Sequence, residues 1–345
     1  MNDSARTAHR AEHPPENQRA VEVVADLYGL SGVQVLSDLG LWGETLRLHC
    51  VAASGFHFLL KEKPHYLSPD DWPLHLAVHS WAREAGGPVS PLLRTPSGAT
   101  GVRADGRYFE VQGWVDGKAS TADEAEEFGR ALGFFHLSVA GMPPGDRDLP
   151  RSRSRWTPDD PAGLAAYIDR HCRPRIADGS PAHVPFDELR RTVNDLCGMT
   201  PGTGLVESYL HGDTAPANAI RTGDGSLALI DFDDARWGNR VFDLAHATAM
   251  TAGFATGPDD GVRTEWNASA AHAVIQGYGS VVDLTPGERG DLGRQMSVAT
   301  IASGFSCLEI DDPEFDLRPD LAEQLHRLSS LVADIPSVTS AVSTI

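Results

Sequence analysis

Two acidic loops, each following a short apolar segment, constrain this chain more than any other feature of its sequence. The first segment ends at Leu210 and leads into HGDTAPAN; the second, LALI, leads into DFDDA. Asp and Asn are common turn formers, so one such loop alone would indicate backbone capping. Two of them, about a dozen residues apart, favour a functional site, because strand ends can hold side chains at defined positions.

The length and charge of the chain bound its class. It has 345 residues and a formal net charge of −19, which suits one large domain or two lobes. The acidic charge argues against general binding to nucleic acid or to an anionic membrane, because phosphates attract basic surfaces. The sequence has no apolar run of the roughly 20 residues that a membrane helix needs, and its first residues lack a signal-peptide core. We therefore expect a cytoplasmic protein with no nucleic-acid or membrane partner.

The first part of the chain has the pattern of strands with one helix between them. Residues 45–52 and 56–63 are separated by ASG, which suits a hairpin turn. Residues 68–87 begin with Ser, Pro and acidic residues and end in two glycines, as helices do. The segment RYFEVQGWVDG, at 107–117, predicts a strand that leaves into a turn.

Helices dominate from Thr121 onward, where Thr121 and Glu124 have the spacing of a capping box. Helical periodicity is expected near residues 164–175, 186–199, 241–250, 270–282, 288–305 and 320–335. The predicted class is α+β, with a small antiparallel-sheet lobe before a larger helical lobe. The predicted parts are a mobile N-terminal tail at 1–17, the sheet lobe at 18–116 and the helical lobe at 117–345. A cleft between two lobes is the usual place for a ligand.

The two acidic loops have the side chains that phosphoryl transfer requires. This reaction needs a metal held against the phosphates, a carboxylate aimed at the acceptor hydroxyl, and a cation on the phosphates. Asn218 and Asp231 offer the amide and carboxylate oxygens that Mg²⁺ prefers. Asp213, in the loop after the first apolar segment, is placed to orient a hydroxyl or to accept its proton.

The pattern H-G-D-x-x-x-x-N, followed by I-D-F, resembles the catalytic and metal-binding loops of the aminoglycoside phosphotransferase and choline kinase family, which shares the protein-kinase fold. The resemblance covers about Val33–Met250. It implies a bilobal kinase-like fold and a kinase that uses ATP and Mg²⁺. It also implies that Asp213 is the catalytic base and that Asn218 and Asp231 are the magnesium ligands.

Neighbouring residues take supporting roles in the same resemblance. His211 is a structural member of the catalytic loop, and Asp243 is the acid that begins a helix behind the site. Asp233 and Asp234 lie near the metal ligands and are placed to assist through water.

The resemblance also implies a nucleotide site in the strand-rich lobe. Lys61 is the lysine expected on the α- and β-phosphates, and strand alternation puts Lys63 on the same face. Gly40 and Gly43 belong to the loop expected to cover the phosphates.

A hinge whose main chain reads adenine is expected at Glu110–Gly117, and Gln112 and Trp114 are its assigned nucleotide-binding residues. One position departs from the family pattern, which has a helix glutamate that pairs with the strand lysine. His75 falls near that position, and a histidine offers no fixed negative charge. Either another acid holds Lys61, or the helix register differs from the expected one.

The acceptor stays open on the sequence alone. The family phosphorylates small hydroxyl compounds such as aminoglycosides, choline and homoserine, and a minority of members act on Ser or Thr in peptides. The string DFDDAR is more similar to homoserine-kinase-like and stress-response Ser/Thr kinase members than to typical aminoglycoside resistance enzymes. We expect a small-molecule hydroxyl substrate; the alternatives are a Ser/Thr-containing peptide substrate and a nucleotide-binding pseudokinase that regulates a partner.

Overall fold

The computed structural model describes residues 15–39, 45–63, 72–143, 160–176, 179–255, 261–307 and 320–340. The chain divides into two compact units, Met1–Glu84 with Val89–Asp116, and Ala85–Pro88 with Gly117–Ile345. We call them the sheet unit and the helical unit and describe each by itself.

The sheet unit is built on an antiparallel sheet with the strand order β1-β2-β3-β5-β4. Its elements are α1 (Pro15–Leu27), β1 (Gln34–Asp38), β2 (Arg47–Val51), β3 (His57–Glu62), α2 (Trp72–Glu84), β4 (Gly101–Ala104) and β5 (Arg107–Gly113). The hairpin expected around the ASG turn is confirmed, because β2 pairs with β3 and places Val51 opposite His57. On β3, residues of even number face one side of the sheet and those of odd number face the other.

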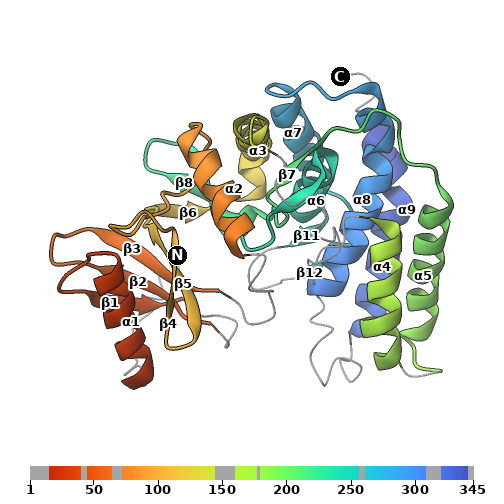
Figure 1. The fold of residues 1–345 in the computed structure, drawn as a ribbon. Coiled ribbons are helices and arrows are strands. Elements are labelled where there is room, and N and C mark those ends of the chain that lie inside the picture. The colour runs from red at the N-terminus through yellow and green to blue at the C-terminus, as the bar shows by residue number, and fades with distance from the viewer. Residues whose placement is uncertain are drawn as a thin grey trace, which may run out of the picture. The chain divides into compact units, whose positions relative to one another are not determined.

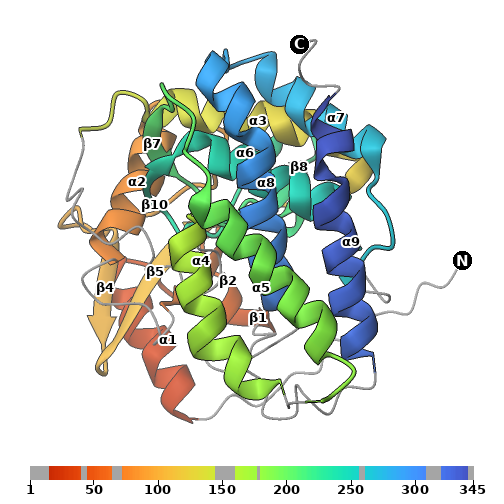
Figure 2. The same ribbon diagram turned by 90° about the vertical axis from the view of Figure 1, so that its right-hand side faces the viewer.

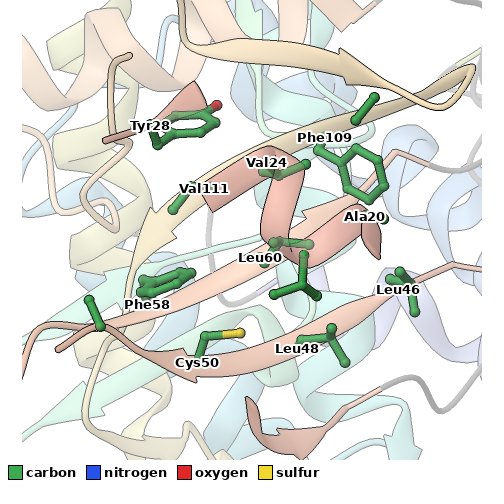
Figure 3. Packing of buried hydrophobic residues seen from close by; sticks show 13 residues of the cluster. Ala20, Val24, Tyr28, Leu46, Leu48, Cys50, Phe58, Leu60, Phe109 and Val111 are labelled. Carbon is green, nitrogen blue, oxygen red and sulfur yellow. The ribbon is translucent and has the colours of Figure 1, made fainter. Parts of the chain in front are cut away.

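One side of α1 and one face of the sheet form a hydrophobic core (Figure 3). Helix α1 contributes Ala20, Val21, Val24 and Tyr28, and the strands contribute Leu48, Cys50, Phe58, Leu60, Phe109 and Val111. Each large apolar side chain buried in this way contributes about 1.5–3 kcal/mol to stability. The sequence assigns residues 15–17 to a tail, whereas α1 begins at Pro15, because its apolar side is held against the sheet.

The helical unit begins with a short strand and continues mainly as helices (Figure 1). Its helices are α3 (Ala125–Val139), α4 (Pro161–Tyr167), α5 (His183–Gly198), α6 (Arg240–Ala252), α7 (Ala268–Gly279), α8 (Pro286–Cys307) and α9 (Leu321–Ser340). Its strands are β6 (Gly117–Ala119), β7 (Glu207–Leu210), β8 (Ala219–Thr222), β9 (Leu227–Leu229), β10 (Arg236–Asn239), β11 (Phe254–Ala255) and β12 (Gly261–Val262). The capping box is confirmed, since the Thr121 N–H donates to Glu124 Oε2 at 3.0 Å.

Helix α8 runs through the middle of the helical unit, with α6 and α9 packed against it (Figure 2). Buried side chains lie around most of its circumference, so α8 forms the core of this unit. No helix among the residues given above is long and apolar enough to cross a membrane.

Helices α3 and α7 approach each other closely through glycines. A Cβ atom on Gly129 would lie 2.0 Å from the carbonyl oxygen of Val274, and one on Gly277 would lie 1.9 Å from that of Glu126. No side chain fits at such distances, so the two backbones can meet only where both helices carry glycine. This contact sets the position of α3, which carries a histidine into the site described next.

Candidate active site

The two acidic loops meet in the helical unit because Gly212 has no side chain. Its φ is +85°, in the left-handed region that favours glycine. A Cβ atom there would lie 2.0 Å from the main-chain oxygen of Asp234. The loop after β7 can therefore approach the loop after β9 at this point, which brings the chemistry-bearing residues of both together.

Asp243, on the first turn of α6, anchors the first loop from behind. Its Oδ2 accepts a hydrogen bond from the His211 N–H at 2.7 Å, and its Oδ1 accepts one from the Gly212 N–H at 3.1 Å. The His211 ring bonds the main-chain oxygen of Ile230 at 2.9 Å, which ties this loop to the end of β9. These contacts agree with the structural roles that the resemblance implies for His211 and Asp243.

The Asp243 carboxylate is held in turn by α3 and α7. His136 Nε2 donates to Asp243 Oδ2 at 3.1 Å, and His136 Nδ1 bonds the Tyr278 hydroxyl at 2.8 Å. Burial opposes ionisation of Asp243, but the hydrogen bond and charge of His136, together with His211, outweigh it and lower its pKa. Asp243 is thus an ionised carboxylate that is buried and satisfied.

Asp213 and Asn218 are in direct contact. The Asn218 side-chain amide donates to Asp213 Oδ2 at 2.7 Å and to the Asp213 main-chain oxygen at 3.0 Å. The short turn Pro216–Asn218 returns the chain toward Asp213 and makes this contact possible. The nitrogen of Asn218 faces Asp213, so its amide oxygen is the atom left for a metal ion.

Asp213 lies in an acidic environment. Burial, followed by the charges of Asp234 and Asp231, raises the pKa of Asp213 to about 7, although Asn218 and Arg236 act in the opposite direction. A carboxylate with such a pKa is matched to proton transfer near neutral pH. Asp213, Asn218 and Asp231, which the sequence singled out, therefore lie near one another, and their roles stay predictions.

The main chain of Asp231 is strained. Its φ is +65°, a left-handed conformation that costs a residue other than glycine free energy. Within the described ranges no group of three or more His, Cys, Asp or Glu side chains forms a metal cluster. The oxygen donors of Asn218 and Asp231 instead fit Mg²⁺, which commonly takes one or two protein ligands together with phosphates and water.

The lysine expected to contact the phosphates lies in the sheet unit on β3. Lys61 and Lys63 are buried, each with 2% of its surface exposed. Their Nζ atoms lie 3.9 Å and 2.7 Å, respectively, from the carboxylate oxygens of Glu110 on β5. Glu62 faces the opposite side, where its Oε2 accepts from the Leu46 N–H at 3.1 Å and lies 3.3 Å from Arg107.

Glu110 belongs to a buried chain of polar groups in the sheet unit. The Gln112 side-chain amide donates to Glu110 Oε1 at 2.7 Å, and the Ser90 hydroxyl donates to Gln112 Oε1 at 3.0 Å. His79 of α2 bonds the main-chain oxygen of Ser90 at 2.8 Å. The Gln112 side chain is bonded within this network. The expected contact of Gln112 with nucleotide therefore stays a prediction, and it concerns the main chain of this residue.

Trp114, another residue expected to bind nucleotide, lies against a histidine of the sheet unit. The Trp114 indole stacks on His49, with ring centroids 3.6 Å apart and planes 7° from parallel. Both rings lie in the sheet unit, on the face that also carries Lys61. A contact between Trp114 and the adenine of the nucleotide stays a prediction. Gly40 and Gly43 lie outside the described residues.

The main residue that the sequence did not single out is Glu110. Its position was included only in the hinge segment, although an acid between apolar residues in RYFEVQG is an available signal. Its partnership depends on the pairing of β3 with β5, which puts Lys61 opposite Glu110. That register is a tertiary property.

Comparison with known proteins identifies the family. The model of the phosphotransferase enzyme family matches residues 45–290. The chain belongs to this family. It is accordingly an ATP-dependent phosphotransferase, which confirms the enzyme class expected from the two loops.

Curated relatives of this phosphotransferase include homoserine kinases. The homoserine kinase of Caulobacter sp. (strain K31) is 26% identical over 242 residues, which cover 67% of this chain and 68% of that protein. The homoserine kinase of Pseudomonas aeruginosa (strain LESB58) is 27% identical over 181 residues, which cover 51% and 52%. This alignment thus spans about half the length of the Pseudomonas enzyme.

Solved structures share the fold of this phosphotransferase at low sequence identity. An aminoglycoside phosphotransferase from Alicyclobacillus acidocaldarius has a TM-score of 0.63 at 17% identity and covers 99% of this chain and 100% of its own. An amicoumacin kinase in complex with AMP-PNP and Ca²⁺ has a TM-score of 0.66 at 15% identity, with 93% of each chain covered. These likenesses confirm the kinase-like α+β fold predicted from the sequence.

Proposed function

We propose that this chain transfers the γ-phosphate of ATP, in the presence of Mg²⁺, to the hydroxyl of a small amino alcohol. The observation that carries the proposal is the contact between Asp213 and Asn218 beside Asp231 and Asp234. A general base, a metal-binding amide and a metal-binding carboxylate are the groups that phosphoryl transfer to an alcohol requires.

Each residue has a definite task in this proposal. Asn218 holds Oδ2 of Asp213, which leaves Oδ1 to accept a hydrogen bond from the acceptor hydroxyl and to orient it for attack. Asn218 and Asp231 would hold Mg²⁺ through their side-chain oxygens. The ion, when bound, supplies positive charge that neutralises the phosphates. Lys61 would add a second positive charge from the sheet unit.

The names of the relatives support a small amine-bearing acceptor. They include homoserine kinases, an aminopropanol kinase and an aminoglycoside phosphotransferase, whose named substrates carry both an amine and a hydroxyl. The acidic charge of this chain is compatible with a cationic acceptor. Homoserine and related amino alcohols are therefore the first compounds to test.

The regulatory alternative rested on the missing helix glutamate. Because the Glu110 carboxylate lies 3.9 Å from Lys61, that departure no longer favours a protein without catalysis. The peptide alternative is addressed by the same screen as the small acceptors.

The proposal is tested by following ADP release with ATP, Mg²⁺ and a panel of acceptors. The panel contains homoserine, 1-amino-2-propanol, ethanolamine, choline, an aminoglycoside and a Ser/Thr peptide. One small amino alcohol should be phosphorylated well above the others, and ³¹P NMR should show its phosphate monoester. Transfer to the peptide alone, or nucleotide binding without transfer to any acceptor, would contradict the proposal.

A matched pair of variants separates the site from the rest of the fold. Asp213→Asn should lower kcat by about 100-fold or more, the usual contribution of a general base. Asp224→Asn removes a carboxylate from an exposed turn of the same unit and should leave kcat within about twofold. Removal of divalent ions with EDTA should abolish transfer, and added Mg²⁺ should restore it.

A further inference from the structure

We propose that Glu110, on strand β5, is the residue that positions Lys61 toward the phosphates of the nucleotide. This inference rests on the proposed function, because it assigns a partner to the lysine that the proposed function uses for the phosphates. In this chain His75 stands at the position expected for the helix glutamate. Glu110, an acid on the neighbouring strand, takes the place of that glutamate.

The pairing of the strands places the two side chains together. Lys61 and Glu110 are directly opposite each other in the β3–β5 ladder, so both side chains leave the sheet on the same face. Lys61 Nζ lies 3.9 Å from Glu110 Oε1, and each residue has no more than 2% of its surface exposed. At this distance and burial the carboxylate fixes the ammonium electrostatically without a short contact.

Glu110 is itself held from two sides. Lys63 Nζ lies 2.7 Å from Oε2, and Gln112 Nε2 donates to Oε1 at 2.7 Å. Lys63 therefore makes the tight ion pair, while Lys61 makes the looser one. The two lysines thus differ in their distance from the carboxylate: Lys63 lies close to it, and Lys61 lies further away on the same face.

Helix α2 supplies histidines where a fixed negative charge would be expected. His75 and His79 are both buried. Burial, with Glu110 and Ser90 acting in the opposite direction, lowers the pKa of His79 to about 4, so its ring is neutral at physiological pH. A neutral ring can accept or donate a hydrogen bond but cannot replace a carboxylate beside Lys61.

The change of element has a mechanical consequence. A glutamate on a helix reaches the lysine only when the helix is in place, which is how many kinases are controlled. Glu110 and Lys61 belong to paired strands of one sheet, so their separation is set by the ladder and not by the position of α2. The lysine is therefore oriented before any nucleotide binds.

The test measures how strongly the phosphates contribute to nucleotide binding. Dissociation constants for MgADP and for adenosine are determined by calorimetry for the wild type, Lys61→Ala, Glu110→Gln and Glu62→Gln. Glu110→Gln should weaken MgADP about tenfold, a coupling usual for residues in contact, and change adenosine binding less than twofold. Glu62→Gln, which alters a buried carboxylate on the opposite face, should leave the ratio of the two constants unchanged.

A double variant distinguishes positioning from a general structural role. If Glu110 acts through Lys61, Lys61→Ala combined with Glu110→Gln should bind MgADP no more weakly than Lys61→Ala alone. Glu110→Asp keeps the charge but shortens the reach, and should weaken MgADP by an intermediate factor. It also serves as the deciding variant if Glu110→Gln does not fold.

The outcomes separate this inference from the proposed function. Unchanged MgADP binding in Glu110→Gln, or in Glu110→Asp where only that variant folds, would overturn the inference. Equal losses for MgADP and adenosine, or additive losses in the double variant, would also overturn it. A wild type that does not bind MgADP would overturn the proposed function itself. A wild type that binds MgADP and loses affinity in Lys61→Ala keeps the proposed function, whatever Glu110 does.

Discussion

Asp243 in the helical unit and Glu110 in the sheet unit are both buried carboxylates, but their partners are of different kinds. Asp243 accepts hydrogen bonds from main-chain N–H groups and from His136, so it fixes the path of a loop. Glu110 is surrounded by side-chain donors, including two lysines, so it fixes the direction of a cation. The first carboxylate shapes the backbone and the second orients a side chain.

This difference determines which property should change when each carboxylate is removed. A loop that loses its anchor can rearrange over several residues, whereas a lysine that loses its partner stays on a strand held by its ladder. We therefore expect substitutions around Asp243 to affect stability first and substitutions around Glu110 to affect binding first.

The largest expected loss of stability follows Asp243→Asn. This change replaces an ionised acceptor of three donors by an amide whose N–H groups face other donors, and should lower the free energy of unfolding by about 3 kcal/mol. Urea denaturation measures it, with Asp224→Asn as the control. A loss below about 1 kcal/mol would contradict an anchoring role for Asp243.

Gly277→Ala should come next, because it disturbs the contact that carries His136 to Asp243. The added methyl would lie 1.9 Å from the main-chain oxygen of Glu126, which forces α3 and α7 apart at a cost of about 2 kcal/mol. Gly279→Ala on the same helix meets nothing within 4 Å and should be neutral or slightly stabilising. Equal stability of the two variants would show that the close approach of the helices is relaxed in solution.

The sheet unit should lose stability in acid, because its polar network contains the buried ring of His79. The pKa of His79 is lowered to about 4 from 6.5, so unfolding takes up a proton between these values. The stabilisation is therefore full above about pH 6.5 and is lost as the pH falls toward 4. His79→Gln should reduce this decline by about 1–2 kcal/mol relative to wild type, measured by urea denaturation across pH, whereas His326→Gln, at an exposed site on α9, should not change it.

The smallest expected effect has the opposite sign. The folded pKa of Asp213 is raised to about 7 from 3.8, so ionisation of this group costs stability as the pH rises through that interval. Asp213→Asn should accordingly stabilise the fold by about 1 kcal/mol at pH 8 and by nothing at pH 4. Thermal melting at both pH values checks it; a variant less stable than wild type at pH 8 would show that the carboxylate is well accommodated when ionised.

The parts of the fold that were predicted from the sequence are those with local patterns. The hairpin, the capping box at Thr121 and the helices of the second unit follow from turn residues and periodicity within short segments. Helix α1 was not anticipated, because its first residues are polar and its apolar side is recognisable only against the sheet that covers it (Figure 3).

The site divides in the same way. Asp213, Asn218 and Asp231 stand at fixed offsets from short strands, so sequence spacing indicated that they would meet. The bond from His136 to Tyr278 joins residues 142 positions apart, and the pair of Lys61 with Glu110 depends on strand register. Contacts of that kind are set by tertiary packing, which single-sequence patterns do not contain.

The left-handed backbone of Asp231 has a consequence for how this protein responds to selection. Glycine or asparagine would accept that conformation more readily than aspartate, and either would remove a negative charge that acts on Asp213. A laboratory evolution experiment that selects for heat resistance alone should therefore enrich replacements at this position, and under the proposed function these variants should be stable but inactive.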